Sequence, residues 1–220
     1  MKKKLVIFGC GQLAELAYYY FQNDSAYEVI AFTTDKDYKS SEIFCGLPLV
    51  DFEEIEKQYN RNNHSLFIAI GYNNLNKLRV QKCLEAKSKG YKLASYISTK
   101  ATILTHNIGE NAFILEDNTI QPFVKIGDHV TLWSGNHVGH HSIIEDNCFI
   151  ASHVVISGGV TIGQNSFIGV NATLRNHITI GKYNVIGASA LILKDTPDEA
   201  VFIAKAAEIS KVSSTKLRGM

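Results

Sequence analysis

From Ile108 to Ile192 the chain carries an aliphatic residue at every sixth position. A helix repeats near 3.6 residues and a strand at 2, so neither keeps one face apolar at period six over so long a stretch. A triangular parallel β-helix does, because each side of the triangle is one short strand whose aliphatic anchor points at the axis. The fifteen anchors predict five coils of eighteen residues; they are Ile108, Ile114, Ile120, Ile126, Leu132, Val138, Ile144, Ile150, Ile156, Ile162, Ile168, Leu174, Ile180, Ile186 and Ile192.

Glycine directly follows many of these anchors, at positions 109, 127, 139, 163, 169, 181 and 187. We expect these glycines to form the corners of the triangle, where the backbone turns sharply and a Cβ would crowd the turn. Residues eighteen apart stack on successive coils. His140 and Gly158 are therefore expected to share one corner, while Ser152, Val170 and Ala188 line another.

The first hundred residues follow a different pattern, in which short apolar runs alternate with helical periodicity. The expected strands are 4–8, 27–33 and 66–70, and the expected helices end near 21 or span 52–58 and 75–89. In the last helix Leu75, Leu78, Val80 and Cys83 are available to one face. This alternation predicts an α/β domain with a small parallel sheet that binds ligands at the carboxyl ends of its strands. The predicted domains are a Rossmann-like unit at 1–98, a β-helix at 99–196 and a tail at 197–220.

Composition changes this picture little. The 220 residues have a net charge of +1, which gives no electrostatic reason to expect nucleic acid or a membrane surface as a partner. No long apolar stretch follows the basic start, so neither a signal peptide nor a membrane span is expected. The four cysteines form no C-x-x-C pair, which favours a reduced, cytoplasmic setting. For Cys148 we expect core packing rather than a nucleophilic role.

The turn after the first strand reads G-x-G-x-x-A at residues 9–14, which places backbone N–H groups at a helix N-terminus suited to a pyrophosphate. The segment Gly71-Tyr72-Asn73-Asn74 ends a second strand and is expected to face the same crevice, followed by Arg79 on the next helix. Two loops and a cation favour an anionic ligand. A nicotinamide-dependent enzyme remains an alternative, although Ala14 replaces the third glycine; a turn that binds nothing is another.

Three segments carry a family resemblance: the glycine turn, Ala69–Arg79 and Leu132–His141. Together they resemble the bacterial nucleotide-sugar N-acetyltransferases of the left-handed β-helix superfamily, a group that includes sialic acid O-acetyltransferase and PglD-like proteins. The nearest branch acts on nucleotide-linked 4-amino-4,6-dideoxy sugars, such as dTDP-4-amino-4,6-dideoxyglucose or GDP-perosamine, for O-antigen, lipopolysaccharide or other surface glycans. The resemblance covers nearly the whole chain. It implies a left-handed solenoid, acetyl-CoA as co-substrate, no metal, and a homotrimer whose grooves each need two subunits.

The resemblance also implies a general base. By motif the family's catalytic histidine falls on His140, and a neutral imidazole suits a proton acceptor near pH 7 during direct attack of the amine on the thioester. His137 and His141 compete for this role. In several relatives an acid follows the histidine; here it is His141, so we expect either no such assistance or help from Glu116 or Asp117.

The remaining site residues are carried over from the same family. For acetyl-CoA these are Gly158, Val170, Ala188 and Lys205, the last within a segment that lacks the proline of relatives. For the nucleotide-sugar they are Gly9, Gly11, Gln12, Asp35, Lys36, Gly71, Asn73 and Arg79. The small residues among the coenzyme set are equally explained by tight stacking of coils.

Other functions stay open on the sequence. A β-helix sugar O-acyltransferase would keep the same ladder. The histidine cluster also permits a trimeric zinc enzyme of the γ-carbonic-anhydrase type, in which His153 and His177 are recruited and imidazoles from separate coils converge across an interface. A β-helix that serves only as a scaffold would need no histidine cluster.

Overall fold

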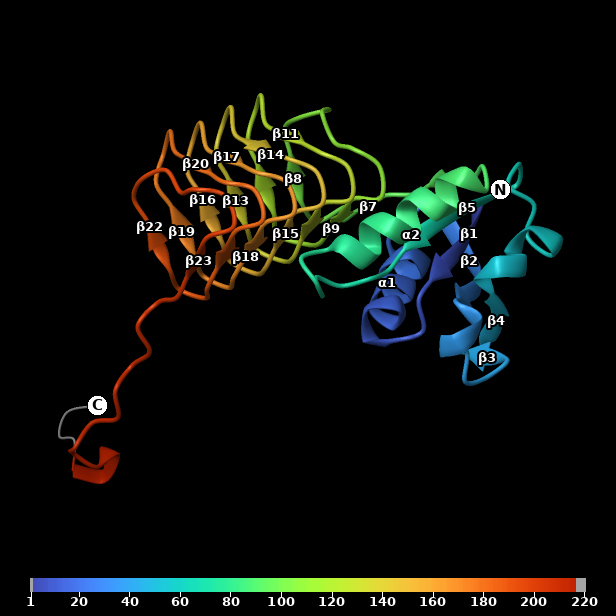
Figure 1. Cartoon of the computed structure of the whole chain (residues 1–220), viewed down its shortest axis with the longest axis horizontal. Helices are drawn as coiled ribbons and strands as arrows, with labels where there is room; N and C mark the ends of the chain where they lie inside the picture. The colour runs from blue at the N-terminus through green and yellow to red at the C-terminus, as the bar shows by residue number, and fades with distance from the viewer. Residues whose placement is uncertain (1, 217–220) are drawn as a thin grey trace.

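The computed structural model describes residues 2–216. It contains a small α/β domain that packs on one end of a triangular solenoid, and the C-terminal segment extends away from the other end (Figure 1). No helix among the described residues is long and apolar enough to cross a membrane.

The N-terminal domain is built on a six-stranded sheet with the order β3-β4-β2-β1-β5-β6. Its strands run parallel except for β3, which pairs antiparallel with β4. The strands are β1 (Lys3–Phe8), β2 (Tyr27–Thr34), β3 (Ile43–Phe44), β4 (Leu47–Asp51), β5 (His64–Ile68) and β6 (Lys92–Leu93). The helices are α1 (Gln12–Asn23), α2 (Lys77–Ser88) and the 3₁₀ turns η1 (Lys36–Tyr38) and η2 (Phe52–Lys57).

The expected parallel sheet is therefore present, with three differences. The segment expected as a helix at 52–58 is the 3₁₀ turn η2, and β3, β4 and β6 join the sheet without having been expected. The apolar face assigned to the second helix was wrong: α2 buries Arg79, Lys82, Cys83 and Ala86, while Leu78 stays 44% exposed. The polar residues of that face lie inward because α2 packs against both the sheet and the solenoid.

The solenoid has three faces, each a parallel sheet of two-residue strands. The seven-stranded face has the order β23-β21-β18-β15-β12-β9-β7, the six-stranded face β22-β19-β16-β13-β10-β8, and the four-stranded face β11-β14-β17-β20. The strands are β7 (Tyr96–Ile97), β8 (Thr102–Ile103), β9 (Phe113–Ile114), β10 (Thr119–Ile120), β11 (Lys125–Ile126), β12 (Thr131–Leu132), β13 (His137–Val138), β14 (Ile143–Ile144), β15 (Phe149–Ile150), β16 (Val155–Ile156), β17 (Thr161–Ile162), β18 (Phe167–Ile168), β19 (Thr173–Leu174), β20 (Thr179–Ile180), β21 (Val185–Ile186), β22 (Leu191–Ile192) and β23 (Val201–Phe202).

The predicted period is confirmed by the register of these strands. Along the ladder each strand pairs with the one eighteen residues later, as Val138 does with Ile156 and Ile156 with Leu174. The anchors form one continuous apolar core along the axis of a left-handed β-helix. The solenoid is longer than expected at both ends, because β7 already pairs with β9 and β23 pairs with β21. It therefore spans 96–202, and the tail begins near Ile203 rather than at 197.

The corners are turned by residues other than the glycines that follow the anchors. The residue three after each anchor from Ile108 to Ile186 has a positive φ, as in Asn111, His141 and Asn171, whereas Gly139 does not. A Cβ on Gly139 would instead lie 2.5 Å from the backbone N of Gly158 on the next coil. The expectation that these glycines are needed for the sharp turn was therefore wrong. They are needed because a Cβ would keep adjacent coils from approaching closely.

Three corners, A, B and C, separate the faces. Corner A joins the seven-stranded to the six-stranded face (for example residues 133–136), corner B joins the six-stranded to the four-stranded face (139–142), and corner C returns to the seven-stranded face (127–130).

The N-terminal domain is tied to the solenoid by polar bonds from both helices. The Tyr20 hydroxyl of α1 donates to Glu116 Oε2 at corner A over 2.7 Å, and Asp24 accepts the Tyr96 hydroxyl over 2.7 Å. Just before α2, the Leu75 carbonyl accepts from the Asn165 side-chain amide over 2.9 Å. These bonds hold the carboxyl ends of the strands toward the solenoid.

Candidate functional site

The first part of the site is the glycine turn between β1 and α1. Gly9 has a φ of 126°, and a Cβ there would lie 3.0 Å from the Ala69 carbonyl oxygen, so the backbone of the β5 end comes very close. Gly11 is the N-cap of α1 and has open space around it. Gln12 is exposed at the first helical position. The first N–H groups of a helix have no partner within the helix, so this turn can bind an anion.

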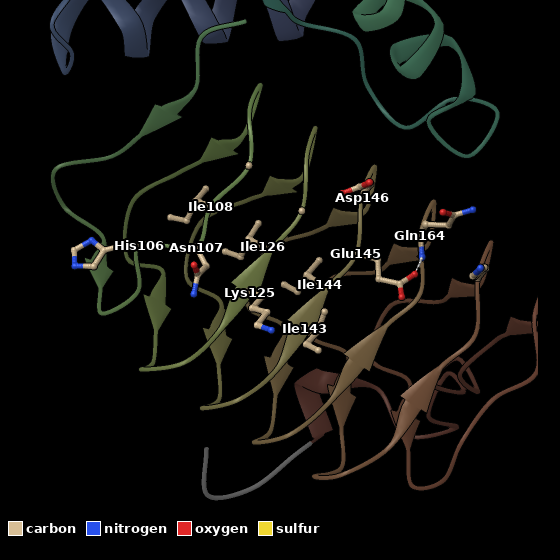
Figure 2. A pocket seen from close by; sticks show the side chains of 13 residues that line it. His106, Asn107, Ile108, Lys125, Ile126, Ile143, Ile144, Glu145, Asp146 and Gln164 are labelled. Carbon is tan, nitrogen blue, oxygen red and sulfur yellow. Dashed lines mark hydrogen bonds between the residues drawn. The ribbon is translucent and has the colours of Figure 1, made fainter.

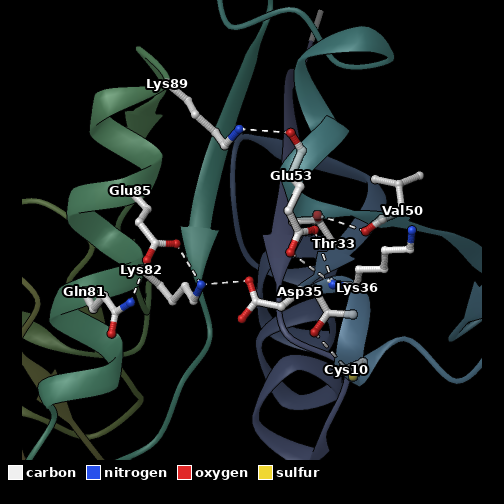
Figure 3. Close-up of polar contacts among 11 residues, drawn as sticks. Cys10, Thr33, Asp35, Lys36, Val50, Glu53, Gln81, Lys82, Glu85 and Lys89 are labelled. Carbon is white, nitrogen blue, oxygen red and sulfur yellow. Dashed lines mark hydrogen bonds and ion pairs between the residues drawn. The ribbon is translucent and has the colours of Figure 1, made fainter.

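The end of β2 adds Asp35 and Lys36 (Figure 3). Asp35 Oδ1 accepts from Lys82 Nζ over 2.7 Å, and Lys82 also contacts Glu85 over 2.7 Å. The backbone N–H of Lys36 donates to the Glu53 carboxylate. Burial disfavours the charged form of Lys82, but the two carboxylates outweigh it and raise the pKa of the ammonium group. The structure thus places Asp35 at the crevice, held by a lysine that sequence analysis did not identify.

Arg79 does not belong to this crevice, contrary to the sequence-based expectation. Its side chain is 2% exposed and points into the junction with the solenoid. The guanidinium donates to Thr131 Oγ1 over 3.1 Å and to the carbonyls of Ile70, Asn147 and Cys148 over 3.3 to 3.5 Å. Burial lowers the pKa of this group to about 10. Arg79 therefore joins the two domains and is unavailable to a nucleotide.

A pocket continues the crevice toward corner A. It has a volume of about 380 Å³ and is lined by Gln12, Leu13, Leu16, Gly71, Tyr72, Trp133 and Phe149. The Tyr72 ring packs with its centroid 4.9 Å from that of Phe149 and 4.7 Å from that of Phe167. Asn73 is exposed beside this loop. The aromatic wall was not predicted, although the sequence contains a signal for it: Phe149 and Phe167 stand one residue before their anchors, where side chains point outward.

His140 lies at corner B, between β13 and β14, and is exposed. Its backbone N–H donates to Gln121 Oε1 over 2.8 Å, and its Nδ1 lies 3.1 Å from Nδ1 of His141. A Cβ on Gly158 would lie 2.7 Å from both Cε1 and Nε2 of the His140 ring. His140 and Gly158 therefore stack as the period predicts. His137 lies in β13, on the six-stranded face rather than at the corner.

Neither acid expected to assist His140 reaches it within the chain. Glu116 is at corner A, where it accepts from the Tyr20 hydroxyl and, over 2.6 Å, from Ser134 Oγ. Burial acts against its charged form, but these hydrogen bonds prevail and lower the pKa of the carboxyl group. Asp117 is exposed in the same turn. Within one chain neither residue can orient His140, because the six-stranded face separates the two corners.

The residues expected to contact the coenzyme do not form one track on a single chain. Val170 and Ala188 are exposed at corner A, whereas Gly158 is at corner B. Lys205 lies in the exposed C-terminal segment and pairs with Glu208 over 3.0 Å. Cys148 is fully buried in the core, and burial raises the pKa of its thiol to about 12, which agrees with a packing role.

The only group within residues 2–216 with the geometry to hold a metal in a single chain is Glu110, Asp128 and His129 at corner C. None of the corner B histidines belongs to it. Lys87 already bonds to Glu110, and Asp128 Oδ1 accepts the Glu110 N–H over 2.9 Å. The Lys87 ammonium group therefore already provides a positive charge to this cluster, and the hydrogen bond of Asp128 holds the corner together.

A wide groove of about 700 Å³ runs along the four-stranded face (Figure 2). Its lining includes Lys125, Ile143 and Glu145, whose carboxylate accepts the Gln164 N–H over 2.9 Å. None of the residues expected in the site lies in this groove.

Comparison with known proteins accounts for both domains. Residues 4–83 match the family model of the PglD N-terminal domain, and residues 125–158 and 159–194 match the model of the bacterial transferase hexapeptide. A comparison with curated protein sequences returned no significant match.

Several solved structures share the fold over nearly the whole chain. The acetyltransferase domain of PglB from Neisseria gonorrhoeae FA1090 is 24% identical, with a TM-score of 0.80 over 91% of this chain and 96% of that chain. PerB from Caulobacter crescentus, in complex with CoA and GDP-perosamine, is 24% identical, with a TM-score of 0.78 over 90% and 92%. WeeI from Acinetobacter baumannii AYE is 20% identical, with a TM-score of 0.75 over 90% and 94%.

Proposed function

Because this chain joins a PglD N-terminal domain to bacterial transferase hexapeptide repeats, we propose that it is an acetyl-CoA-dependent N-acetyltransferase of a nucleotide-linked amino sugar. The observation that carries the proposal is the pairing of an anion-binding crevice in the first domain with an exposed histidine at a solenoid corner. Related folds have been solved with acetyl-CoA, in PglB, and with CoA and GDP-perosamine, in PerB. The proposed substrate carries a 4-amino-4,6-dideoxy sugar destined for surface glycans, and the proposed location of the reaction is the cytoplasm.

The crevice suits such a substrate in two ways. The glycine turn offers N–H groups to a diphosphate, and Asp35 lies at the end of β2, where a ribose hydroxyl is bound in dinucleotide folds. The adjoining pocket is walled by Tyr72, Trp133 and Phe149. An apolar wall favours a deoxy sugar, because a C6 methyl group loses no hydrogen bonds there.

His140 is proposed as the general base of a direct transfer. The neutral amine forms a bond to the thioester carbonyl carbon, and the C–S bond then breaks with the electron pair leaving on sulfur. The amine proton passes to His140 Nε2 and then to the departing thiolate, so that no acyl-enzyme forms. A backbone N–H stabilises the oxyanion of the tetrahedral intermediate.

The geometry supports a site shared between two chains of a homotrimer. The crevice, its pocket, Val170 and Ala188 all lie toward corner A, whereas His140 and Gly158 lie at corner B across the six-stranded face. In a single chain, the proposed substrate-binding crevice is therefore separated from the proposed base, His140. Packing corner B of a neighbour against corner A brings the two sets together, as a cyclic oligomer allows.

Mixing two inactive variants tests this arrangement. His140→Ala removes the base, and Gly11→Asp places a carboxylate at the anion site, where the open space and the N-cap position tolerate it. Random mixed trimers are expected to regain roughly a quarter of wild-type activity, because one interface in four then combines an intact crevice with an intact histidine. The measurement is thiol release after co-expression with two affinity tags. A mixture as inactive as its parents would place the whole site in one chain.

Gly158→Ala tests the position of the His140 ring. The new Cβ would overlap the ring at 2.7 Å, and the ring must swing aside because the backbone cannot move. We expect kcat to fall by roughly 10- to 100-fold, since a displacement near 1 Å is costly in general-base catalysis. The matched control is Asn176→Ala, which alters the same corner one coil further along and should leave kcat within about twofold. Equal kcat values for the two variants would show that the position of the His140 ring does not matter for the reaction.

The function itself is tested by thiol release from acetyl-CoA across a panel of nucleotide-linked sugars. We expect turnover on 4-amino-4,6-dideoxy sugars and none on the matching 4-hydroxy sugars. Turnover only on hydroxyl acceptors would make the protein an O-acyltransferase. Tight binding of NADH with no binding of any nucleotide-sugar, followed through Trp133 fluorescence, would end the acyltransferase assignment.

A further inference from the structure

The rings of His140 and His141 contact each other directly. Their Nδ1 atoms are 3.1 Å apart and their planes are nearly perpendicular, at 85°. The His141 ring also packs against Phe123, with centroids 4.7 Å apart. Among residues 2–216, no carboxylate is hydrogen-bonded to either ring. The contact between the two nitrogens is thus the one polar bond that fixes either imidazole.

A hydrogen bond between two Nδ1 atoms contains one proton, so one ring donates and the other accepts. If His141 donates, His140 uses its Nδ1 lone pair and its proton sits on Nε2, where a base is needed. If His140 donates, its Nε2 keeps a free lone pair. That nitrogen is the one that lies above Gly158, on the side of the ring away from His141.

We infer that His141 is a positioning residue that accepts the Nδ1 proton of His140 and so holds the base in the tautomer with Nε2 unprotonated. This inference rests on the proposed function of His140. Once Nε2 takes the amine proton, the same bond joins an imidazolium to a neutral imidazole, and such charge-assisted bonds are stronger. His141 thereby supplies what an acidic neighbour would otherwise provide, with no charge of its own.

The surroundings hold His141 in place for this task. Its φ is 61°, a left-handed turn that swings the side chain beside its predecessor, and its backbone N–H donates to the Pro122 carbonyl over 3.3 Å. The Gln121 side chain accepts from the His140 backbone N–H, and the Phe123 ring packs against the His141 ring. The nearest stacked turn residues are Gly159 and then His177, which lies against that glycine. In a single chain, the nearest turns stacked beyond His141 therefore contribute a glycine and a histidine, and no carboxylate.

The chain itself indicates which substitutions this turn accepts. The equivalent turn position on the preceding coil holds Phe123 with φ 67°, and the corresponding position of corner A holds Asn171 with φ 58°. His141→Phe therefore keeps the backbone, and the ring shape that packs on Phe123, but removes the acceptor. His141→Asn also keeps the backbone and retains an acceptor, because Oδ1 of asparagine occupies the branch position of Nδ1 of histidine.

The test combines two readouts on the full-length oligomer. With ¹⁵N-labelled histidine, the wild-type NMR spectrum at pH 8 should show His140 protonated on Nδ1, and His141→Phe should shift the proton to Nε2. In the acetyl transfer assay, kcat should fall by about 10²-fold in His141→Phe with both KM values within about threefold, and His141→Asn should recover most of the loss.

The two readouts keep this inference distinct from the proposed function. A wild-type protein with His140 protonated on Nε2, or a phenylalanine variant with unchanged tautomer or undiminished kcat, would overturn the role of His141. If no sugar in the panel is acetylated but the ¹⁵N spectra change as expected, the positioning role stands and the proposed substrate class is wrong.

Discussion

His140→Ala is expected to lower kcat for acetyl transfer by about 10³-fold, within the range that general-base catalysis contributes. The imidazole is exposed at corner B and stacks over Gly158, so its removal opens no cavity in the core. The affinity for CoA should change little, because the substitution leaves in place the backbone groups of Gly158, Val170 and Ala188 that are proposed to contact the coenzyme. The measurements are steady-state thiol release and CoA binding by calorimetry.

The matched control is His137→Ala, three residues earlier on the six-stranded face. Its kcat should stay within about threefold of wild type, since surface substitutions away from a site have small effects. If His140→Ala retained full turnover while His137→Ala lost it, the base would be His137, and corner B would not be the catalytic corner.

Arg79→Ala is expected to destabilise the protein by about 3 kcal/mol, because the change leaves buried carbonyl groups without a donor and opens a cavity. The guanidinium is 2% exposed and bonds to groups of both domains, including Ile70 O and Thr131 Oγ1. Removing the buried charge also removes its desolvation cost. The decrease in the free energy of unfolding is therefore smaller than the summed energies of the hydrogen bonds that Arg79 makes. Chemical denaturation of the wild type and the variant measures the difference.

Arg175→Ala is the control for this variant. Arg175 is exposed and donates to a single carbonyl, that of Leu193, over 3.2 Å. Its removal should change the free energy of unfolding by less than about 0.5 kcal/mol. At temperatures where Arg79→Ala remains folded, its KM for the nucleotide-sugar should match the wild type. A large rise in KM without loss of stability would return Arg79 to the crevice.

The candidate site shows where sequence reasoning succeeds and where it fails. The stacking of His140 over Gly158 follows from spacing alone, because a fixed period places residues eighteen apart on successive coils. The partner of that histidine did not follow: Glu116 was named as a possible source of assistance, yet in this chain it bonds to Tyr20 at another corner. The period places Glu116 one corner away from His140, but only the tertiary structure shows which groups each corner meets.

Helix α2 gives the same lesson for the first domain. A pattern of aliphatic residues indicated a face with Leu78, but the buried face carries Arg79 and Lys82. Both polar residues bond to partners outside the helix: Arg79 to Thr131 of the solenoid, and Lys82 to Asp35 at the carboxyl end of β2. A helix that packs between two domains buries polar groups when each supplies hydrogen bonds, and this pairing cannot be read from one element.

The sequence by itself determined the solenoid, its coil length and the glycine turn of the first domain, because local periodicity dictates which side chains face an axis or a sheet. Tertiary structure alone decided that Arg79 joins the domains, that Trp133 and Tyr72 wall a pocket, and that the two nitrogens of His140 and His141 meet. These features depend on contacts between segments far apart in the chain or on the exact turn of the backbone. A repeat pattern carries no information about either.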